Sequence, residues 1–256
     1  MPLFESKSGK VEPTPDVQGA PTGTGASDDW GQYAGMGLDD LNSKNCSLPW
    51  LGISQAQSKI VVENIAQMGV FFNSATMESY GNTIEVIPVY FKPVWVEKDS
   101  STGKTLNTYE VKGIPVNEER NEKGYPEYTH PDSGNKIVEL YTYALVLKNA
   151  PEEGFLLFRP GLSALRKLRA WNSQLRTSVW PNGMQAPIFG FSWKLSLGIE
   201  KRQQGSGSYA TIVSIQRGEA ISPTNTMFVS SILPARQQAL AGAGNVALLT
   251  DEGSEE

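Results

Sequence analysis

The stretch IFGFSWKLSLGIEK, residues 188–201, decides the fold, because its apolar and polar residues alternate with a period of two. One side of an extended chain here carries Phe189, Phe191, Trp193, Leu195, Leu197 and Ile199, and the other carries Gly190, Ser192, Lys194, Ser196, Gly198 and Glu200. This strict alternation predicts a half-buried β-strand.

The neighbouring sequence predicts further strands. GSYATIVSIQR (207–217) follows the turn-like RQQGSG, so we expect it to pair with the first strand as a hairpin. Other short runs are rich in Val, Ile, Phe and Tyr and are bounded by Gly, Pro or Asn. They predict strands at 83–98, 136–149, 154–160 and, in TMFVSSIL, at 226–233. The fold class is therefore predicted to be mainly β.

Two helices and one long loop interrupt these strands. A helical pattern covers roughly 55–68, and a second, RPGLSALRKLRAWNSQLRTSVW (159–180), predicts a prominent helix at 161–176. On its helical wheel Leu165, Leu168, Trp171 and Leu175 form an apolar face, with arginines on an adjacent sector. Residues 98–135 are polar, turn-rich and mostly aperiodic, which predicts a long loop excursion with at most a strand near 109–114.

Composition predicts the domain organisation. Residues 1–45 are dominated by Gly, Pro, Ser, Thr and Asp, which predicts a disordered N-terminal segment. A single β-rich domain at 46–233 follows, and residues 234–256 are expected to form a flexible acidic tail ending in Asp251, Glu252, Glu255 and Glu256. The lone Cys46, and the absence of a signal-like or membrane-spanning stretch, favour the cytoplasm and argue against a membrane partner.

The usual signatures of catalysis, metal binding and nucleotide binding are missing. SSTGKT (100–105) resembles the end of a phosphate-binding loop, but Lys98 stands where that loop needs a glycine. His130, the single histidine, lies in a turn-like loop without a nucleophile context. The acidic pairs lack the spacing of a metal cage. We therefore expect a non-enzymatic protein with no cofactor, no metal and no catalytic residue.

Charge is distributed unevenly along the chain. Eight cations and Glu200 give residues 159–202 a net charge of +7, whereas the whole chain carries −5, so the remaining residues sum to −12. Such a block suits one face that follows phosphates while the rest stays soluble. Aromatic residues lie between the cations, and exposed rings can stack on the bases of a single strand. The predicted nucleic-acid-binding residues are Arg159, Arg166, Lys167, Arg169, Trp171, Arg176, Trp180, Lys194, Lys201 and Arg202.

Four segments resemble a family of largely uncharacterised bacteriophage proteins. They are LPWLGISQAQS (48–58), GVFFNSATMESYGNTIEVIPVYFKPVWVE (69–97), LSALRKLRAWNSQL (162–175) and PIFGFSWKLS (187–196), within a resemblance covering about 46–217. Such proteins look like distant relatives of phage single-stranded-DNA-binding proteins of the OB class. The resemblance, together with the order of strands and helix, implies an OB-like five-stranded barrel. It also implies a tail that occupies the basic groove when DNA is absent.

The expected function is a phage single-stranded-DNA-binding protein that coats strands without sequence choice in replication or recombination. Its partners would be single-stranded DNA and, through the acidic tail, replication or recombination proteins, with a homodimer as one arrangement. Two alternatives stay open. One is a minor virion structural or assembly protein. The other is an inhibitor of a host enzyme whose acidic ends mimic DNA.

Overall fold

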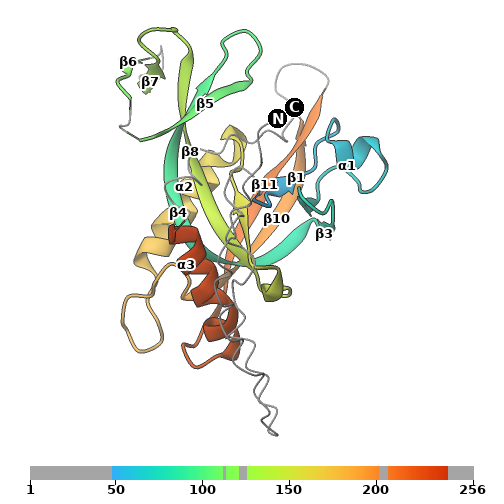
Figure 1. The fold of residues 1–256 in the computed structure, drawn as a ribbon, viewed down its shortest axis with the longest axis vertical. Helices are drawn as coiled ribbons and strands as arrows, with labels where there is room; N and C mark the ends of the chain where they lie inside the picture. Colours follow the sequence, from blue (N-terminus) through green and yellow to red (C-terminus); the bar gives the residue numbers. More distant parts are fainter. Residues whose placement is uncertain (1–47, 112–113, 121–125, 202–206, 242–256) are drawn as a thin grey trace, which may run out of the picture. The chain divides into compact units, whose positions relative to one another are not determined.

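The computed structural model describes residues 48–111, 114–120, 126–201 and 207–241, all within the unit Ser43–Glu256. In these ranges the fold is mainly β (Figure 1). The predicted disordered segment 1–45 lies outside the described residues.

One curled antiparallel sheet carries most of the strands (Figure 1). Its strand order is β11-β10-β4-β8-β7-β6, with β5 on β4 and β9 on β8. The bounds are β4 (Thr83–Lys98), β5 (Thr105–Glu110), β6 (Asn117–Arg120), β7 (Pro126–Thr129), β8 (Lys136–Leu147), β9 (Phe155–Phe158), β10 (Phe191–Lys201) and β11 (Ser208–Ala220). A second sheet contains β1 (Leu51–Ile53), β2 (Phe71–Asn73) and β3 (Ser79–Gly81). The mainly β class is thus confirmed, whereas eight strands in one sheet do not confirm the five-stranded OB barrel.

Several strand predictions are confirmed. The strand predicted at 83–98 is β4, and those predicted at 136–149 and 154–160 are β8 and β9. β10 and β11 form the predicted hairpin, paired antiparallel from Phe191 opposite Ala220 to Lys201 opposite Ser208. β4 has the β-branched and aromatic composition of a strand. It is long enough to pair β10 at Thr83–Val86, β5 at Val94–Lys98 and β8 along most of its length.

The middle of β4 pairs with a described strand on one side only. Among the described strands, residues 87–93 pair with β8 alone, because β10 ends its pairing at Val86 and β5 begins at Val94. Pro88 and Pro93 lie within this stretch. Proline lacks the N–H that a central strand needs, so it is tolerated where one strand edge has no partner. The result is a gap in the sheet beside β4.

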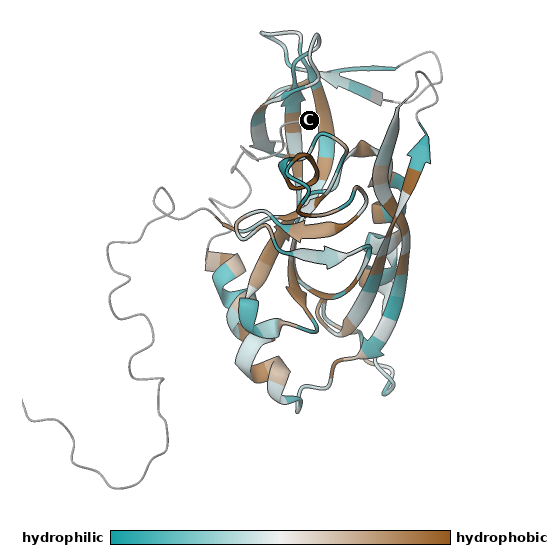
Figure 2. Cartoon of the chain, turned by 90° about the vertical axis from the view of Figure 1, so that its right-hand side faces the viewer, coloured by the Kyte–Doolittle hydropathy of each residue, from teal (hydrophilic) through white to brown (hydrophobic). Residues whose placement is uncertain are grey.

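A hydrophobic core lies on each face of the large sheet. Neighbouring residues of a strand point to opposite faces. Val86, Tyr143 and Leu145 accordingly join one core, while Ile87, Ala144 and Val146 join the other. Hydrophobic residues are concentrated along the strands of the large sheet (Figure 2). Helix α2 (Leu165–Thr177), entered through the 3₁₀ turn η3 (Leu162–Ala164), covers the first face with Leu168, Trp171 and Leu175.

The second face is covered by the π-helix η4 (Phe228–Ile232) and α3 (Leu233–Ala241). The strand predicted at 226–233 is therefore wrong, because a short apolar run is consistent with either a strand or a buried helix. Ala235 and Ala239 are buried, so residues 234–241 of the predicted tail pack on the sheet. Tail residues 242–256 lie outside the described residues.

Two further predictions need correction. The helix expected at 55–68 is reduced to α1 (Lys59–Val62), since Asn64 turns the backbone into the left-handed region at φ 57°. The excursion 98–135 contains the strands β5, β6 and β7. Its base is held by Glu97, a buried carboxylate that accepts hydrogen bonds from Asn107, Tyr109, Ser133 and Asn135. A further 3₁₀ turn, η2 (Pro151–Glu153), precedes β9.

Candidate nucleic-acid interface

Helix α2 presents a row of arginines to solvent. Arg166, Arg169 and Arg176 are spaced by three and seven residues, which places them on one side of a 3.6-residue helix. We call these three residues the arginine edge. The opposite side holds the helix on the sheet through Leu168, Trp171 and Leu175. The amphipathic pattern predicted from the sequence is thus confirmed, and it directs the three guanidinium groups outward.

The members of the arginine edge differ in their partners. Arg169 donates to the Tyr141 hydroxyl at 3.3 Å, and its guanidinium lies 3.6 Å from the Glu139 carboxylate. The hydrogen bond to Tyr141, with Glu139 nearby, raises the pKa of Arg169 above its already high ordinary value. Arg166 and Arg176 are exposed, and no carboxylate of the described ranges forms an ion pair with either. Two of the three charges therefore remain available to a ligand.

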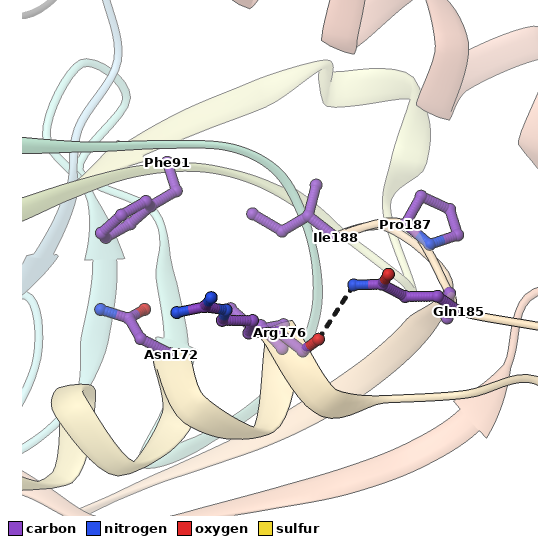
Figure 3. A pocket seen from close by; sticks show the side chains of 8 residues that line it. Phe91, Asn172, Arg176, Gln185, Pro187 and Ile188 are labelled. Carbon is purple, nitrogen blue, oxygen red and sulfur yellow. Dashed lines mark hydrogen bonds between the residues drawn. The ribbon is translucent and has the colours of Figure 1, made fainter.

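The arginine edge ends at an open pocket of about 640 Å³. The pocket lies between α2, the segment 185–188 and β4, next to the gap in the sheet. Asn172 and Arg176 line it from α2, and Phe91 and Ile188 face them from the other side (Figure 3). The remaining lining residues are Leu175, Gln185, Ala186 and Pro187. The pocket thus combines an apolar wall with a polar helix side.

Two predicted phosphate-binding cations are engaged within the protein. Arg159 is half-buried; its Nε donates to Thr142 Oγ1 at 2.8 Å, and its guanidinium lies 5.2 Å from the centre of the Trp50 ring. These contacts engage Arg159 within the fold, between Thr142 of β8 and Trp50, the residue before β1. Lys167 lies 3.7 Å from the Glu200 carboxylate of β10. That partly exposed ion pair weakens the attraction of Lys167 for a phosphate.

Lys194 lies on the other face of the sheet. Its neighbours Trp193 and Leu195 belong to the core under α2, so Lys194 points the opposite way. It stands across from Glu85, whose pKa is lowered by hydrogen bonds from Lys148 and Ser192 and by the charges of Lys148 and Lys194, despite partial burial. A single groove joining Lys194 to the arginine edge is therefore excluded by the sheet between them. Lys201 is exposed at the end of β10, and Arg202 lies outside the described residues.

The two predicted stacking tryptophans are not exposed rings. Trp171 is 1% exposed; it stacks on Tyr143 at a centroid distance of 4.7 Å and meets Trp193 edge-on at 5.9 Å. The prediction that Trp171 stacks on a base is wrong, because helical spacing puts it with the leucines. Trp180 is half-buried, and its Nε1 donates to the Gly190 carbonyl at 3.3 Å.

Sequence reasoning missed the aromatic ring that does lie near the arginine edge. Phe91 is half-buried in β4 and packs against Tyr141 and Tyr143 at 5.6 and 5.2 Å. It also missed Asn172 and Gln185 as pocket residues. No local pattern connects Phe91 with α2, because about 80 residues separate them in the chain and the sheet alone brings them together.

Other kinds of site were sought in the part of the chain that the structure describes. There, no three His, Cys, Asp or Glu side chains gather as metal ligands. No described helix has the length and apolar character to cross a membrane. The predicted tail residues Asp251, Glu252, Glu255 and Glu256 lie outside the described ranges.

Comparison with known proteins gives one match. A family model described as Pam3 phage gp34-like protein matches residues 19–229, which include the core under α2, α2 itself and the pocket. No curated protein and no solved structure matches the chain.

Proposed function

The chain belongs to the Pam3 phage gp34-like family and is a bacteriophage protein, and we propose that it binds single-stranded DNA in replication or recombination of the phage genome. The observation that carries the proposal is the arginine edge, which has two guanidinium groups without an ion-pair partner among the described residues and ends at an open pocket beside Phe91. Binding without sequence choice follows from contacts to phosphates, which every strand shares.

The arginine edge suits a phosphate backbone in length and chemistry. From Arg166 to Arg176 the helix advances about 15 Å, so the edge can meet more than one phosphate. Guanidinium groups bind phosphate oxygens in pairs of hydrogen bonds. Each phosphate that is neutralised releases condensed counterions, which supplies a favourable entropy at low salt. Of the cations predicted from the sequence, Arg166, Arg169 and Arg176 therefore form the proposed site.

The acidic C-terminus fits the proposal as a competitor. α3 ends at Ala241, and the fifteen residues after it carry Asp251, Glu252, Glu255 and Glu256. A chain of that length spans up to about 50 Å when extended, so its carboxylates would reach cations on the same domain. In this proposal the tail occupies the arginine edge when DNA is absent and recruits replication or recombination proteins when DNA displaces it. The curled sheet with a helix after β9 supports the OB-class relationship in the same proposal.

Fluorescence anisotropy of a labelled oligo-dT tests the proposal. At low salt we expect the wild type to bind it more tightly than a duplex of equal length. The variant R166A/R169A/R176A is expected to lose about tenfold or more in affinity, because it removes the two available phosphate partners together with Arg169 between them. K194A is the control: it removes an exposed cation on the opposite face of the sheet and should change affinity little. If the protein binds no single-stranded oligonucleotide, the proposal is refuted.

Truncation after residue 245 tests the tail separately. If the carboxylates compete for the arginine edge, the shortened protein binds oligo-dT more tightly at low salt, and the gain disappears as salt screens the charges. Equal binding by the two proteins would show that the tail does not compete with DNA, and the proposed role of the arginine edge would stand.

The alternative of a virion component makes a different prediction. Mass spectrometry of purified phage particles would find the protein in quantity if it were structural, and would find it absent if it acts in replication. Abundance in particles, combined with weak oligonucleotide binding, would favour the structural alternative.

A further inference from the structure

The pocket at the end of the arginine edge holds hydrogen-bonding groups that the described residues leave unused. Asn172 Oδ1 accepts the Tyr143 hydroxyl at 2.7 Å, which leaves the Nδ2 amide of Asn172 without an acceptor in the described ranges. Gln185 Nε2 donates to the Arg176 carbonyl at 3.1 Å, which leaves Gln185 Oε1 as an acceptor. The Arg176 guanidinium has no described partner. Among these side-chain groups, the free donors of Asn172 and Arg176 outnumber the free acceptor, Gln185 Oε1. Figure 3 shows the three side chains around the pocket.

We propose that this pocket takes one base of the bound strand, and that it favours a base carrying a carbonyl oxygen over adenine. The inference rests on the proposed binding of single-stranded DNA. It adds a contact between the pocket and one base to the contacts between the arginine edge and the phosphates. Thymine, cytosine and guanine present carbonyl acceptors to Asn172 Nδ2 and Arg176. A carbonyl oxygen has two lone pairs and can accept from both donors at once, whereas each ring nitrogen of adenine accepts one hydrogen bond.

The shape and the wall of the pocket fit a flat ring. A volume of about 640 Å³ lies within the range of small-ligand sites and exceeds what one base fills. Phe91 is half-buried, and its contacts with Tyr141 and Tyr143 hold the ring in place while part of it remains open to the pocket. Stacking on a fixed aromatic ring is the usual way a protein holds the base of a single strand.

The neighbouring charges favour a nucleotide over an apolar side chain from a protein partner. Arg176 belongs both to the arginine edge and to the pocket lining, so a phosphate bound on the edge brings its base to the pocket. An apolar group buried there would leave the Asn172 amide and the Arg176 guanidinium unpaired, which is unfavourable. A base satisfies these donors and also buries a ring against Phe91.

Competition binding measures the preference directly. A labelled oligo-dT bound to the full-length protein is displaced by unlabelled dT, dC and dA oligonucleotides of one length. We expect dT and dC to compete about threefold to tenfold better than dA, the effect of one hydrogen bond gained or lost. F91L keeps an apolar wall and removes the ring, so affinity should fall about fivefold for all three oligonucleotides.

The variant N172D isolates the hydrogen bond. It keeps an acceptor for the Tyr143 hydroxyl and replaces the free amide donor with a carboxylate oxygen, so the preference for dT and dC over dA should vanish or reverse. Q174D adds the same charge at an exposed position of α2, two residues away, and should weaken all three oligonucleotides equally.

The outcomes separate this inference from the proposed function. No preference in the wild type, or the same preference in N172D, overturns the base pocket, while binding that depends on the arginine edge still supports the proposed function. Failure of every oligonucleotide to bind overturns both.

Discussion

The two helices that cover the sheet use arginine in opposite ways. α2 buries Leu168, Trp171 and Leu175 and directs Arg166 and Arg176 to solvent. α3 buries Ala235 and Ala239, and small side chains leave room for Arg236 to turn inward. Arg236 donates to the Val89 carbonyl at 2.7 Å, on the unpaired edge of β4, and lies 5.3 Å from the centre of the Phe189 ring.

The comparison shows that a charge count along the sequence does not say where a charge acts. Arg236 completes the hydrogen bonding of a strand that lacks a neighbour, so it belongs to the fold. The guanidinium groups of Arg166 and Arg176 form no hydrogen bond or ion pair with the described part of the domain. The same distinction divides the +7 block, in which Arg159 and Lys167 are engaged internally and Lys194 lies across the sheet.

The largest effect is expected from the buried side of α2. W171A removes a ring packed between Tyr143 and Trp193, and the free energy of unfolding should fall by about 3–5 kcal/mol. Urea denaturation followed by circular dichroism measures it. A loss below about 1 kcal/mol would mean that Trp171 is not core and would reopen the stacking role that the sequence suggested.

Glu97 extends the comparison to a carboxylate held inside the fold. Hydrogen bonds from Asn107 and Asn135, with further ones from Tyr109 and Ser133, lower its pKa to about 2 despite burial. A lowered pKa stabilises the fold above the ordinary value of 4.5, and this stability is lost as the pH falls from 4.5 through 2. The contribution is on the order of 3 kcal/mol.

The variant E97Q tests this contribution. Unfolding free energies of wild type and E97Q are compared from pH 6 down to pH 2, and their difference should shrink by about that amount. A difference that stays constant with pH would show that Glu97 titrates normally.

A matched pair of variants tests the comparison between the helices. R236A leaves the Val89 carbonyl without its charged donor and should destabilise the fold by about 1.5–3 kcal/mol. R166A, an exposed change on the other helix, should stay within about 0.5 kcal/mol of wild type. Thermal unfolding of the two variants under one set of conditions measures both values. Equal destabilisation would break the distinction between internal and external arginines.

The fold was largely predictable where the signal lies within one segment of the chain. β10 follows from alternation, β11 from the turn before it, β4 from its β-branched and aromatic composition, and α2 from its 3.6-residue pattern. Alternation in β10 gives the correct burial for Phe191, Trp193, Leu195 and Leu197, whereas Ser192 on the other face is buried as well. Ile199 is 59% exposed, because β10 pairs with β4 only at Trp193–Ser196 and little core lies beyond. Phe189 joins the core under η4 because the turn at Gly190 precedes the strand. Helix η4 was missed because its short apolar run fits a strand as well as a helix, and α3 because its buried residues are Ala235 and Ala239.

The site was predictable in part. Helical spacing identifies Arg166, Arg169 and Arg176 as one side of α2. Lys194 could not be placed in the same way. Its face of the sheet depends on how β10 pairs with β4 and on which face α2 covers, and a charge pattern shows neither. Phe91 lies in the part of β4 that pairs with β8 but has no described strand on its other side. That arrangement depends on where β10 and β5 stop pairing with β4, so no single segment of sequence predicts it.

The salt dependence of oligo-dT affinity tests the central claim most directly. For wild type and R166A/R169A/R176A, the logarithm of the association constant is plotted against the logarithm of salt concentration. Each lost phosphate contact lowers the slope by about 0.7, so the triple variant should lose about 1.4 through Arg166 and Arg176, and about 2 if Arg169 also exchanges Glu139 for a phosphate. K194A should keep the wild-type slope. If the triple variant keeps the wild-type slope, or K194A loses as much, the arginine edge of α2 is not where this protein meets DNA.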